Sequence, residues 1–522
     1  MLIRGPGQIS IRQPLDIKHT VSPLSFVCNT CKRISTFSEL KNYNLRKGRC
    51  KHCSGILQQT AHIFVHPDCG KIEEIRSKDC PQCNTEMILN KISYADLRTW
   101  QYKCPTCGLS EQLESFCNDC YTQARNVDPS VNYHDYRMRL KPCTSNSVVV
   151  PQSSTIPSFP ELGSDVEPEL LLAEYLGLLR ERGLTLEQAI DKKDQVADLD
   201  NVTETLIREM RAQGISEDKI SRVVEGARRE SGVEAVKDAV RGLFEGQNLD
   251  ALKQRVFDYS GIASNPSRLK SLEEIGSSLS EKELEQTRRT YDHCGVAEAK
   301  LVTGVQLVTC VYGFMVGSSD PDVGFFRPFR DPLGFTAYAI SSESEGILIR
   351  LDRRRTAAWV SRQASSKAPF EVDEDSSLET KKLYLEMEPG TEPFVLVKEL
   401  LHTMSHALIR NANLLCGIGA DSLGELIYPN VPAVLIYSSS ASNLGGIATM
   451  FESGMWKWFA AAEDSISNCT YDPICLSEKG ACHACMHLPE YVCTEWNAAL
   501  DRSRLIGNDR RGMTGFWANG TD

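Results

Sequence analysis

The sequence lacks features that would assign it to several large classes of proteins. No apolar run reaches the roughly 18 residues that a membrane span needs. The first residues, Met1-Leu-Ile-Arg-Gly-Pro, lack the apolar core of a secretion signal. The phosphate-binding loop Gly-x-x-x-x-Gly-Lys-Ser/Thr, the Asp-Glu-x-His/Asp metal box and the His-x-Lys pattern of phospholipase-type nucleases do not occur. We therefore expect a soluble, cytoplasmic protein without an ATP-driven motor and with no membrane partner.

The charge is acidic overall but unevenly distributed. The 522 residues, enough for several domains, carry a net charge of −11, which argues against a wholly basic nucleic-acid-binding protein. Residues 1–143 nevertheless hold 20 Lys and Arg against 13 Asp and Glu, whereas residues 144–522 hold 38 against 56. Because cation-binding thiolates would cancel part of the N-terminal excess, this imbalance is a weak indication of an acidic partner.

Twenty cysteines are the most informative residues. In a reducing compartment they are expected to bind metal rather than form disulfides. Twelve ligand-type residues form six pairs with two residues between the members: Cys28/Cys31, Cys50/Cys53, His66/Cys69, Cys80/Cys83, Cys104/Cys107 and Cys117/Cys120. We expect each pair to join its neighbour along the chain, which gives three zinc ribbons with four ligands each. Four protein ligands leave no open coordination position, so these sites are interpreted as structural. Gly70 and Gly108 follow two pairs, where a positive φ lets N–H groups point at sulfur.

A second group of cysteines lies near the end of the sequence. It comprises five thiols within twenty-five residues: Cys469, Cys475, Cys482, Cys485 and Cys493. The Cys482-x-x-Cys485 spacing places two thiols on one turn, about 3.5–4 Å apart, where they can share a tetrahedral cation. The expected cofactor is therefore Zn²⁺ at about four sites, three of them N-terminal and one C-terminal.

The rest of the sequence divides the chain into four parts. After three zinc-ribbon modules at 1–143, a Pro- and Ser-rich stretch predicts an irregular linker at 144–168. Capping boxes such as Thr185-x-x-Gln188 and Ser280-x-x-Glu283 place a helical domain at 169–292. Residues 293–522 mix strand and helix patterns and contain the zinc site at 469–493. We expect an α+β multidomain protein with N-terminal zinc ribbons, an all-α middle and an α/β C-terminal domain with a Cys-rich zinc tail.

One predicted helix, at 393–415, has an apolar face and a polar face. The polar face carries Glu399, His402, His406 and Arg410. Together with Glu425, which follows the helix, these residues form a candidate functional cluster. His402 and His406 have the one-turn spacing of two metal ligands, but Thr403 stands where a zincin would carry its catalytic Glu. We favour a hydrogen-bonded histidine pair over a second metal site or an active site.

Basic residues supply candidate nucleic-acid contacts beside the first ribbon and in one arginine run. They are Lys32, Arg33, Arg46, Lys47, Arg353, Arg354 and Arg355. Such side chains can bind phosphates. A solvated basic face explains the first group equally well, and a solvent-facing turn is the interpretation we favour for the arginine run.

Several C-terminal motifs together carry a family resemblance. In order they are His402-Thr-Met-Ser405-His406-Ala-Leu-Ile-Arg410, Ser422-Leu-Gly-Glu425-Leu-Ile-Tyr428, Val434-Leu-Ile-Tyr437, Leu444-Gly-Gly446, Cys469, Asp472-Pro473, Cys475, Cys482-His-Ala-Cys485, Glu490, Cys493, Asn497 and Leu500-Asp501-Arg502. The series resembles the DrmB-like accessory proteins of DISARM anti-phage systems. It is also similar to the cysteine-tailed domain of some superfamily 2 helicases. The resemblance covers about residues 293–522, and its C-terminal half is the specific part.

This resemblance implies a partner and a role. DrmB-like proteins bind a superfamily 2 helicase subunit, DrmA-like in kind, and support its engagement of DNA. In the wider domain four cysteines bind zinc, and they match Cys469, Cys475, Cys482 and Cys485. Cys493 is then a fifth thiol that either displaces Cys475 or supports the site from outside. The implied role is a non-catalytic zinc-binding subunit in bacterial defence.

Two alternatives from other functional classes stay open. One is a metal-dependent hydrolase or nuclease that uses Glu399, His402, His406 and Glu425. The other is a stand-alone zinc-ribbon regulator whose residues 1–143 bind duplex DNA.

Overall fold

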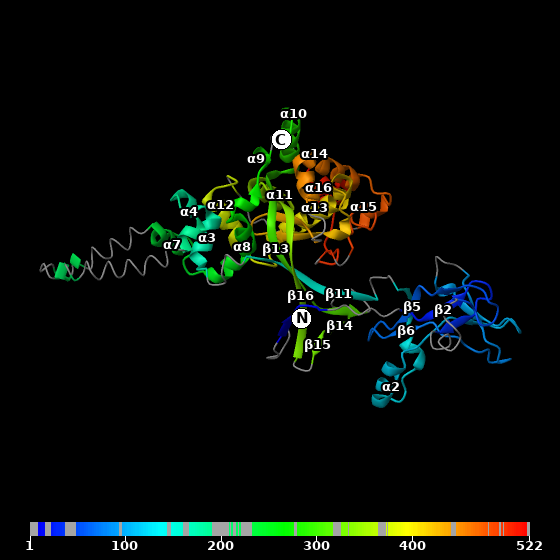
Figure 1. Ribbon diagram of the computed structural model, residues 1–522. Coiled ribbons are helices and arrows are strands. Elements are labelled where there is room, and N and C mark those ends of the chain that lie inside the picture. Colours follow the sequence, from blue (N-terminus) through cyan, green and yellow to red (C-terminus); the bar gives the residue numbers. More distant parts are fainter. Residues whose placement is uncertain are drawn as a thin grey trace. The chain divides into compact units, whose positions relative to one another are not determined.

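The computed structural model divides the chain into two compact units (Figure 1). Unit 1 comprises Met1–Ser154 and Thr309–Ile340, and unit 2 comprises Thr155–Val308 and Ser341–Asp522. The structure describes residues 9–15, 22–36, 48–92, 97–143, 148–159, 166–190, 208, 210–211, 216–217, 219–220, 232–275, 279–316, 325–331, 334–363, 372, 374–439, 445–478, 480–489, 492–493 and 495–518. Among the described helices, none combines the length and apolarity that crossing a bilayer requires.

The centre of unit 2 is a sheet whose strands are buried on both faces. The strand order includes β13 (Val296–Val316), β16 (Gly334–Leu351), β18 (Ala433–Ser438) and β17 (Leu423–Tyr428). β18 pairs antiparallel with both β16 and β17. Ile347 and Ile349 belong to one hydrophobic core and Leu348 to another, because successive strand side chains point to opposite faces. The sheet therefore needs a helical layer on each side.

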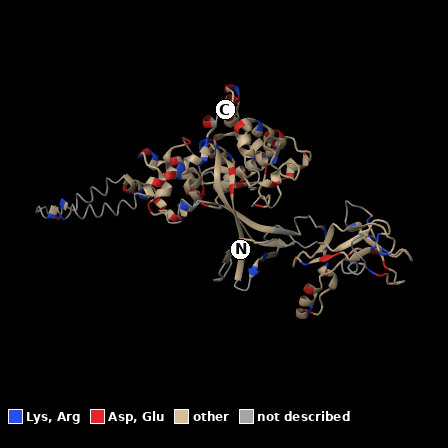
Figure 2. Ribbon diagram, in the orientation of Figure 1, with Lys and Arg blue, Asp and Glu red and all other residues tan. Residues whose placement is uncertain are grey.

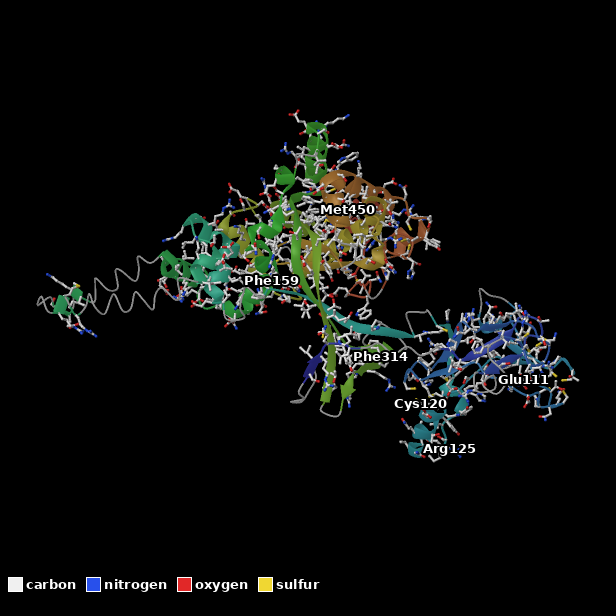
Figure 3. All side chains as sticks on the ribbon, viewed as in Figure 1. Glu111, Cys120, Arg125, Phe159, Phe314 and Met450 are labelled. Carbon is white, nitrogen blue, oxygen red and sulfur yellow. The ribbon has the colours of Figure 1, made fainter. Side chains whose placement is uncertain are left out.

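Helices supply both layers, as Figure 1 shows for α3 and α8 on one side of β13 and α13 and α14 on the other. The first layer contains α3 (Pro168–Leu176), α4 (Leu178–Glu181), α7 (Gly232–Leu243) and α8 (Leu249–Ala263). The second contains α9 (Leu272–Ile275), α10 (Glu281–Cys294), α11 (Arg353–Gln363), α13 (Glu392–Cys416), α14 (Gly446–Ser467), α15 (Ile474–Glu478) and α16 (Ser503–Ile506). Met450, labelled in Figure 3, is buried in this second core. Tyr384 and Leu385 of α12 (Leu378–Glu386) belong to different cores.

The segment predicted as a separate helical domain is instead one layer of unit 2. Leu170, Leu171, Leu172 and Ala173 of α3 are all buried, and a helix that is apolar around its circumference needs partners on several sides. The sheet provides one of them, since Leu348 shares the core of α3. The capping boxes at Thr185/Gln188 and Ser280/Glu283 form as predicted.

Unit 1 contains three small antiparallel sheets. Their orders are β3–β2–β4, β10–β5–β6 and β7–β8–β9. The bounds are Ser25–Cys28 for β2, Ile34–Thr36 for β3, Leu57–Gln59 for β4, His62–Val65 for β5, Ile72–Glu74 for β6, Ile88–Asn90 for β7, Gln101–Lys103 for β8, Ser110–Gln112 for β9 and Arg139–Pro142 for β10, with helix α2 at Asn118–Val127. The sheets share one core that includes Ile34, Phe64 and Trp100, so the modules pack on each other.

The stretch predicted as an irregular linker contains a strand, β11 (Val149–Ser158), which pairs with β13. Pro151 and Pro157 do not prevent this, because β11 lies at the edge of the sheet, where a missing N–H is tolerated. The ends of β13 and β16 that lie in unit 1 pair with short strands: β1 (Ile9–Arg12), β14 (Phe325–Pro328) and β15 (Arg330–Asp331). Phe314, labelled in Figure 3, lies in this part of β13. The overall class is α+β, as the sequence predicts, although the middle is not a domain of its own.

Candidate metal centres

The first cysteine group forms as the spacing predicts. The sulfur atoms of Cys28, Cys31, Cys50 and Cys53 lie within 4.8 Å of one another. Backbone N–H groups face the cluster, with Thr30 N 3.4 Å from Cys28 Sγ and His52 N 3.4 Å from Cys50 Sγ. Burial raises the pKa of Cys28, but the N–H groups of Cys31 and Thr30 outweigh it and lower that pKa to about 6. The group can therefore hold a thiolate-binding cation.

The second and third groups combine their pairs differently from the prediction. His66 and Cys69 lie with Cys117 and Cys120, whereas Cys80 and Cys83 lie with Cys104 and Cys107. Expecting neighbouring pairs to join was wrong, because one site is nested inside the chain segment that closes the other. Strand pairing is the reason: β10 returns to β5, next to His66, while β7 and β8 form a hairpin between the pairs of the inner site.

Local geometry in these two groups suits metal binding. Cys69 and Cys117 sulfurs are 3.6 Å apart, and those of Cys83 and Cys104 are 3.4 Å apart. Gly70 and Gly108 have φ of 68° and 76°, as predicted. The last pair differs from the others because Cys117 caps helix α2 and Cys120 lies in its first turn; Figure 3 labels Cys120 and, further along the helix, Arg125. The start of α2 at Cys117 is the local feature that distinguishes the Cys117/Cys120 pair from the pairs that lie on hairpin turns.

The tail group contains Cys469, Cys475, Cys482 and Cys485, all within 4.8 Å. Cys469 follows α14, Cys475 lies in α15, and the other two lie on one turn with sulfurs 3.6 Å apart. Burial raises the pKa of Cys482, but the N–H groups of Ala484 and Cys485 outweigh it and lower that pKa to about 7. The sequence left open which of Cys475 and Cys493 completes the group, and the geometry places Cys475 there.

Cys493 lies instead with three residues of the predicted polar cluster. His402, His406, Glu425 and Cys493 each offer one donor atom within the same 4.8 Å limit, and all four are buried. The remaining two members lie elsewhere. Glu399 pairs with Arg504 at 2.5 Å. Arg410 donates to the carbonyl oxygens of His487 and Ala484, which holds the tail against α13.

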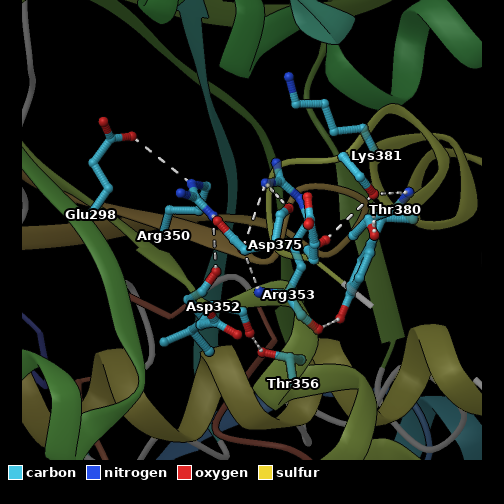
Figure 4. Close-up of polar contacts among 12 residues, drawn as sticks. Glu298, Arg350, Asp352, Arg353, Thr356, Asp375, Thr380 and Lys381 are labelled. Atoms are coloured by element: carbon cyan, nitrogen blue, oxygen red, sulfur yellow. Dashed lines mark hydrogen bonds and ion pairs between the residues drawn. The ribbon is translucent and has the colours of Figure 1, made fainter. Parts of the chain in front are cut away.

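The candidate nucleic-acid contacts have mostly internal partners. Arg353 is 4% exposed, and its backbone N–H donates to Asp375 (Figure 4). Arg355 donates to three carbonyl oxygens, among them that of Phe516. Arg354 is exposed. The three arginines begin helix α11, so the solvent-facing turn was wrong, and two of them do not face phosphates.

The basic residues of unit 1 are also partly neutralised. Arg33 lies 3.8 Å from Glu86, and Lys32 donates to the carbonyl oxygen of Asn29. Ion pairs link Lys71 with Asp119 and Lys78 with the carboxylate of Glu111. Figure 2 shows both charge signs interspersed along this unit, and Figure 3 labels Glu111. Arg46 and Lys47 lie outside the described residues.

Comparisons with known proteins match two segments of the chain to family models. Residues 3–155 match a domain of unknown function, DUF8724, and residues 404–486 match the MrfA Zn-binding domain. The chain is also similar to the DISARM protein DrmB of Bacillus paralicheniformis, with 28% identity over 184 residues. That alignment covers 32% of this chain and 32% of the relative, so it spans about a third of either protein. The predicted resemblance to DrmB and to a helicase-associated zinc domain is confirmed.

Proposed function

We propose that this chain is a non-catalytic, zinc-stabilised accessory subunit that binds a superfamily 2 helicase and supports its engagement of DNA in anti-phage defence. The observation that carries the proposal is the combined similarity of its C-terminal segment to the MrfA Zn-binding domain and of the chain to DrmB. The proposed helicase is DrmA-like, and the nucleic acid is DNA.

In this proposal zinc has a structural role. The ligands are four groups, namely Cys28, Cys31, Cys50 and Cys53; His66, Cys69, Cys117 and Cys120; Cys80, Cys83, Cys104 and Cys107; and Cys469, Cys475, Cys482 and Cys485. Each group offers four N or S donors, a complete tetrahedral set without a position for substrate. Zinc bound in this way contributes folding free energy and stiffens surfaces that meet a partner.

Burial argues against the hydrolase alternative. His402, His406 and Glu425 are at most 3% exposed, so a phosphodiester does not reach them from solvent. Glu399 is paired with Arg504 rather than aimed at the same point. The regulator alternative gains no support from the ion-paired basic residues of unit 1.

The test is reconstitution with a DrmA-like superfamily 2 helicase. The full chain with its metal intact is expected to co-elute with the helicase as a stoichiometric complex, and the complex is expected to bind DNA more tightly than the helicase alone. Single-stranded, duplex and forked DNA would be compared at several salt concentrations, since phosphate contacts weaken with salt.

Metal content and activity provide the controls. Absence of a complex at low salt, with zinc content unchanged, contradicts the proposal. Turnover of ATP or of a phosphodiester by this chain alone contradicts its non-catalytic part.

A further inference from the structure

A second buried cluster lies beside the tail group, where α13, β17 and the tail meet. His402 and His406 are one helical turn apart on α13, Glu425 is on β17, and Cys493 follows the cysteine-rich tail. One turn brings i and i+4 side chains to the same face. The span that matches the MrfA Zn-binding domain, 404–486, omits both His402 and Cys493.

The four donor atoms converge on one point. His402 Nε2 is 3.1 Å from Cys493 Sγ and 3.4 Å from Glu425 Oε1. His406 Nε2 is also 3.4 Å from Glu425 Oε1. In a tetrahedral zinc site with bonds of about 2.0–2.3 Å, ligand atoms are separated by about 3.3–3.7 Å. The observed separations are close to that geometry.

Surrounding contacts orient the donors inward. His406 Nδ1 lies 2.9 Å from the carbonyl oxygen of Met486, which requires the proton on Nδ1 and leaves the Nε2 lone pair facing the cluster. Ser405 donates to Glu425 Oε2 and leaves Oε1 facing the cluster. The backbone N–H of Asn497 lies 3.3 Å from Cys493 Sγ, as expected for a donor to a thiolate.

The cluster leaves two buried atoms without a hydrogen bond. His406 Nε2 and Glu425 Oε1 have no hydrogen-bond partner among the described residues; they approach each other at 3.4 Å, and Glu425 Oε1 also lies 3.4 Å from His402 Nε2. Burying such atoms without a partner costs free energy. A cation at the point where they converge would satisfy both.

The charges also balance for a divalent cation. A carboxylate and a thiolate contribute two negative charges, and two histidines that each keep one N–H are neutral, so a divalent ion brings the total to zero. Buried charges need such compensation.

We propose that His402, His406, Glu425 and Cys493 bind a zinc ion, in a site separate from the tail tetracysteine group. The two nitrogens, one oxygen and one sulfur are a ligand set that zinc accepts in tetrahedral geometry. The four side chains are at most 3% exposed, so the site is closed to substrate. It fastens the tail to α13 and β17, which the tetracysteine group alone does not reach. The proposal concerns metal content and does not depend on a helicase partner.

Metal analysis of variants of the full chain tests the proposal. Cys493→Ser and His406→Ala are each expected to contain one zinc ion fewer per chain than the parent. Cys416→Ser is the matched control, because Cys416 lies on the same helix, is partly buried and belongs to no candidate group. It is expected to keep the parental zinc content. An unchanged zinc content in both Cys493→Ser and His406→Ala overturns the proposal.

Two measurements cover the case in which these variants fail to fold. Crystals of the parent chain are expected to show an anomalous peak at the zinc edge between α13 and β17, separate from the peak of the tail cysteines; its absence overturns the proposal. Cobalt substitution gives a second readout, since His402→Cys retains a ligand and is expected to strengthen the sulfur-to-cobalt absorption by one thiolate. If His402→Cys binds as much cobalt as the parent but its spectrum is unchanged, the proposed site is contradicted.

Discussion

At the scale of single residues, adjacent side chains in the arginine run have unlike environments. Helix α11 begins at Arg353, and successive helical residues point in different directions by about 100°. Arg353 is consequently buried beside Asp375 and Arg354 is exposed. A run of like charges is therefore not by itself a phosphate-binding surface.

We expect Arg353→Ala to lower the free energy of unfolding by about 3 kcal/mol, because it removes a buried guanidinium that donates to the backbone carbonyl oxygen of Asp375 and lies 3.9 Å from the Asp375 carboxylate. Arg354→Ala, one residue further, is expected to change it by less than about 0.5 kcal/mol. Denaturant midpoints of the two variants, measured together with the parent, check this. Equal midpoints for both variants would contradict the internal role of Arg353.

A buried carboxyl group predicts a pH dependence of stability. Burial raises the pKa of Asp258, on α8, to about 6, whereas an unfolded aspartate has a pKa of about 3.9. Between these values the folded state holds a proton that the unfolded state has lost, so this group makes the protein less stable as the pH rises from about 4 to about 6.

Asp258→Asn is expected to remove this loss. The variant should match the parent near pH 4 and exceed it in stability by about 3 kcal/mol near pH 7, because the pKa of Asp258 is about two higher in the folded chain than in the unfolded one. Denaturant titrations at both pH values provide the measurement. A difference that does not vary with pH would indicate that Asp258 titrates normally in the folded chain.

At the scale of elements, sheet pairing decides which ligands share a cation. Two-residue spacing identifies each pair, but two nearby pairs and two distant pairs can close a tetrahedral group equally well. The return of β10 to β5 brings Cys117 to Cys69, across 48 positions in the sequence.

Double variants separate the nested arrangement from the sequential one. If the sites are nested, Cys69→Ser with Cys117→Ser removes one zinc ion, because both changes fall in one site. Cys69→Ser with Cys80→Ser then removes two. Sequential pairing predicts the opposite result for each variant, so zinc content per chain decides between them and each double variant serves as the control for the other.

At the scale of the whole molecule, the two units differ in what stabilises them. The hydrophobic core of residues 22–143 is small, and the same segment contains three candidate metal sites. Unit 2 has two larger hydrophobic cores on the faces of one sheet. Metal contributes a large share of the folding free energy where the apolar core is small.

Removal of zinc with a high-affinity chelator is therefore expected to act unequally. Amide hydrogens in 22–143 and in the tail should lose protection from exchange, while those of β18 (Ala433–Ser438) stay protected in the centre of the sheet. Hydrogen exchange with and without chelator measures this, and restoring zinc gives the control. Simultaneous loss of protection in β18 would mean that unit 2 also depends on metal to fold.

Much of the fold was accessible from sequence patterns. The mixture of strands and helices in 293–522, the long helix α13 and the two described capping boxes follow from alternation, helical periodicity and local hydrogen-bonding residues, all of which are short-range signals. The sequence did not predict that helices of 169–292 pack against the sheet of unit 2, because an apolar helix face does not reveal which partner it packs against.

The sequence by itself determined that cysteine and histidine pairs at ligand spacing are present, that they fall into an N-terminal and a C-terminal group, and that the chain resembles DrmB-like proteins. Only the tertiary structure decided which pairs lie together. It also placed Cys493 with His402, His406 and Glu425 rather than with the tail cysteines. The physical reason is that a cation needs four donors at one point in space, and chain segments far apart in sequence reach that point through strand pairing and helix packing.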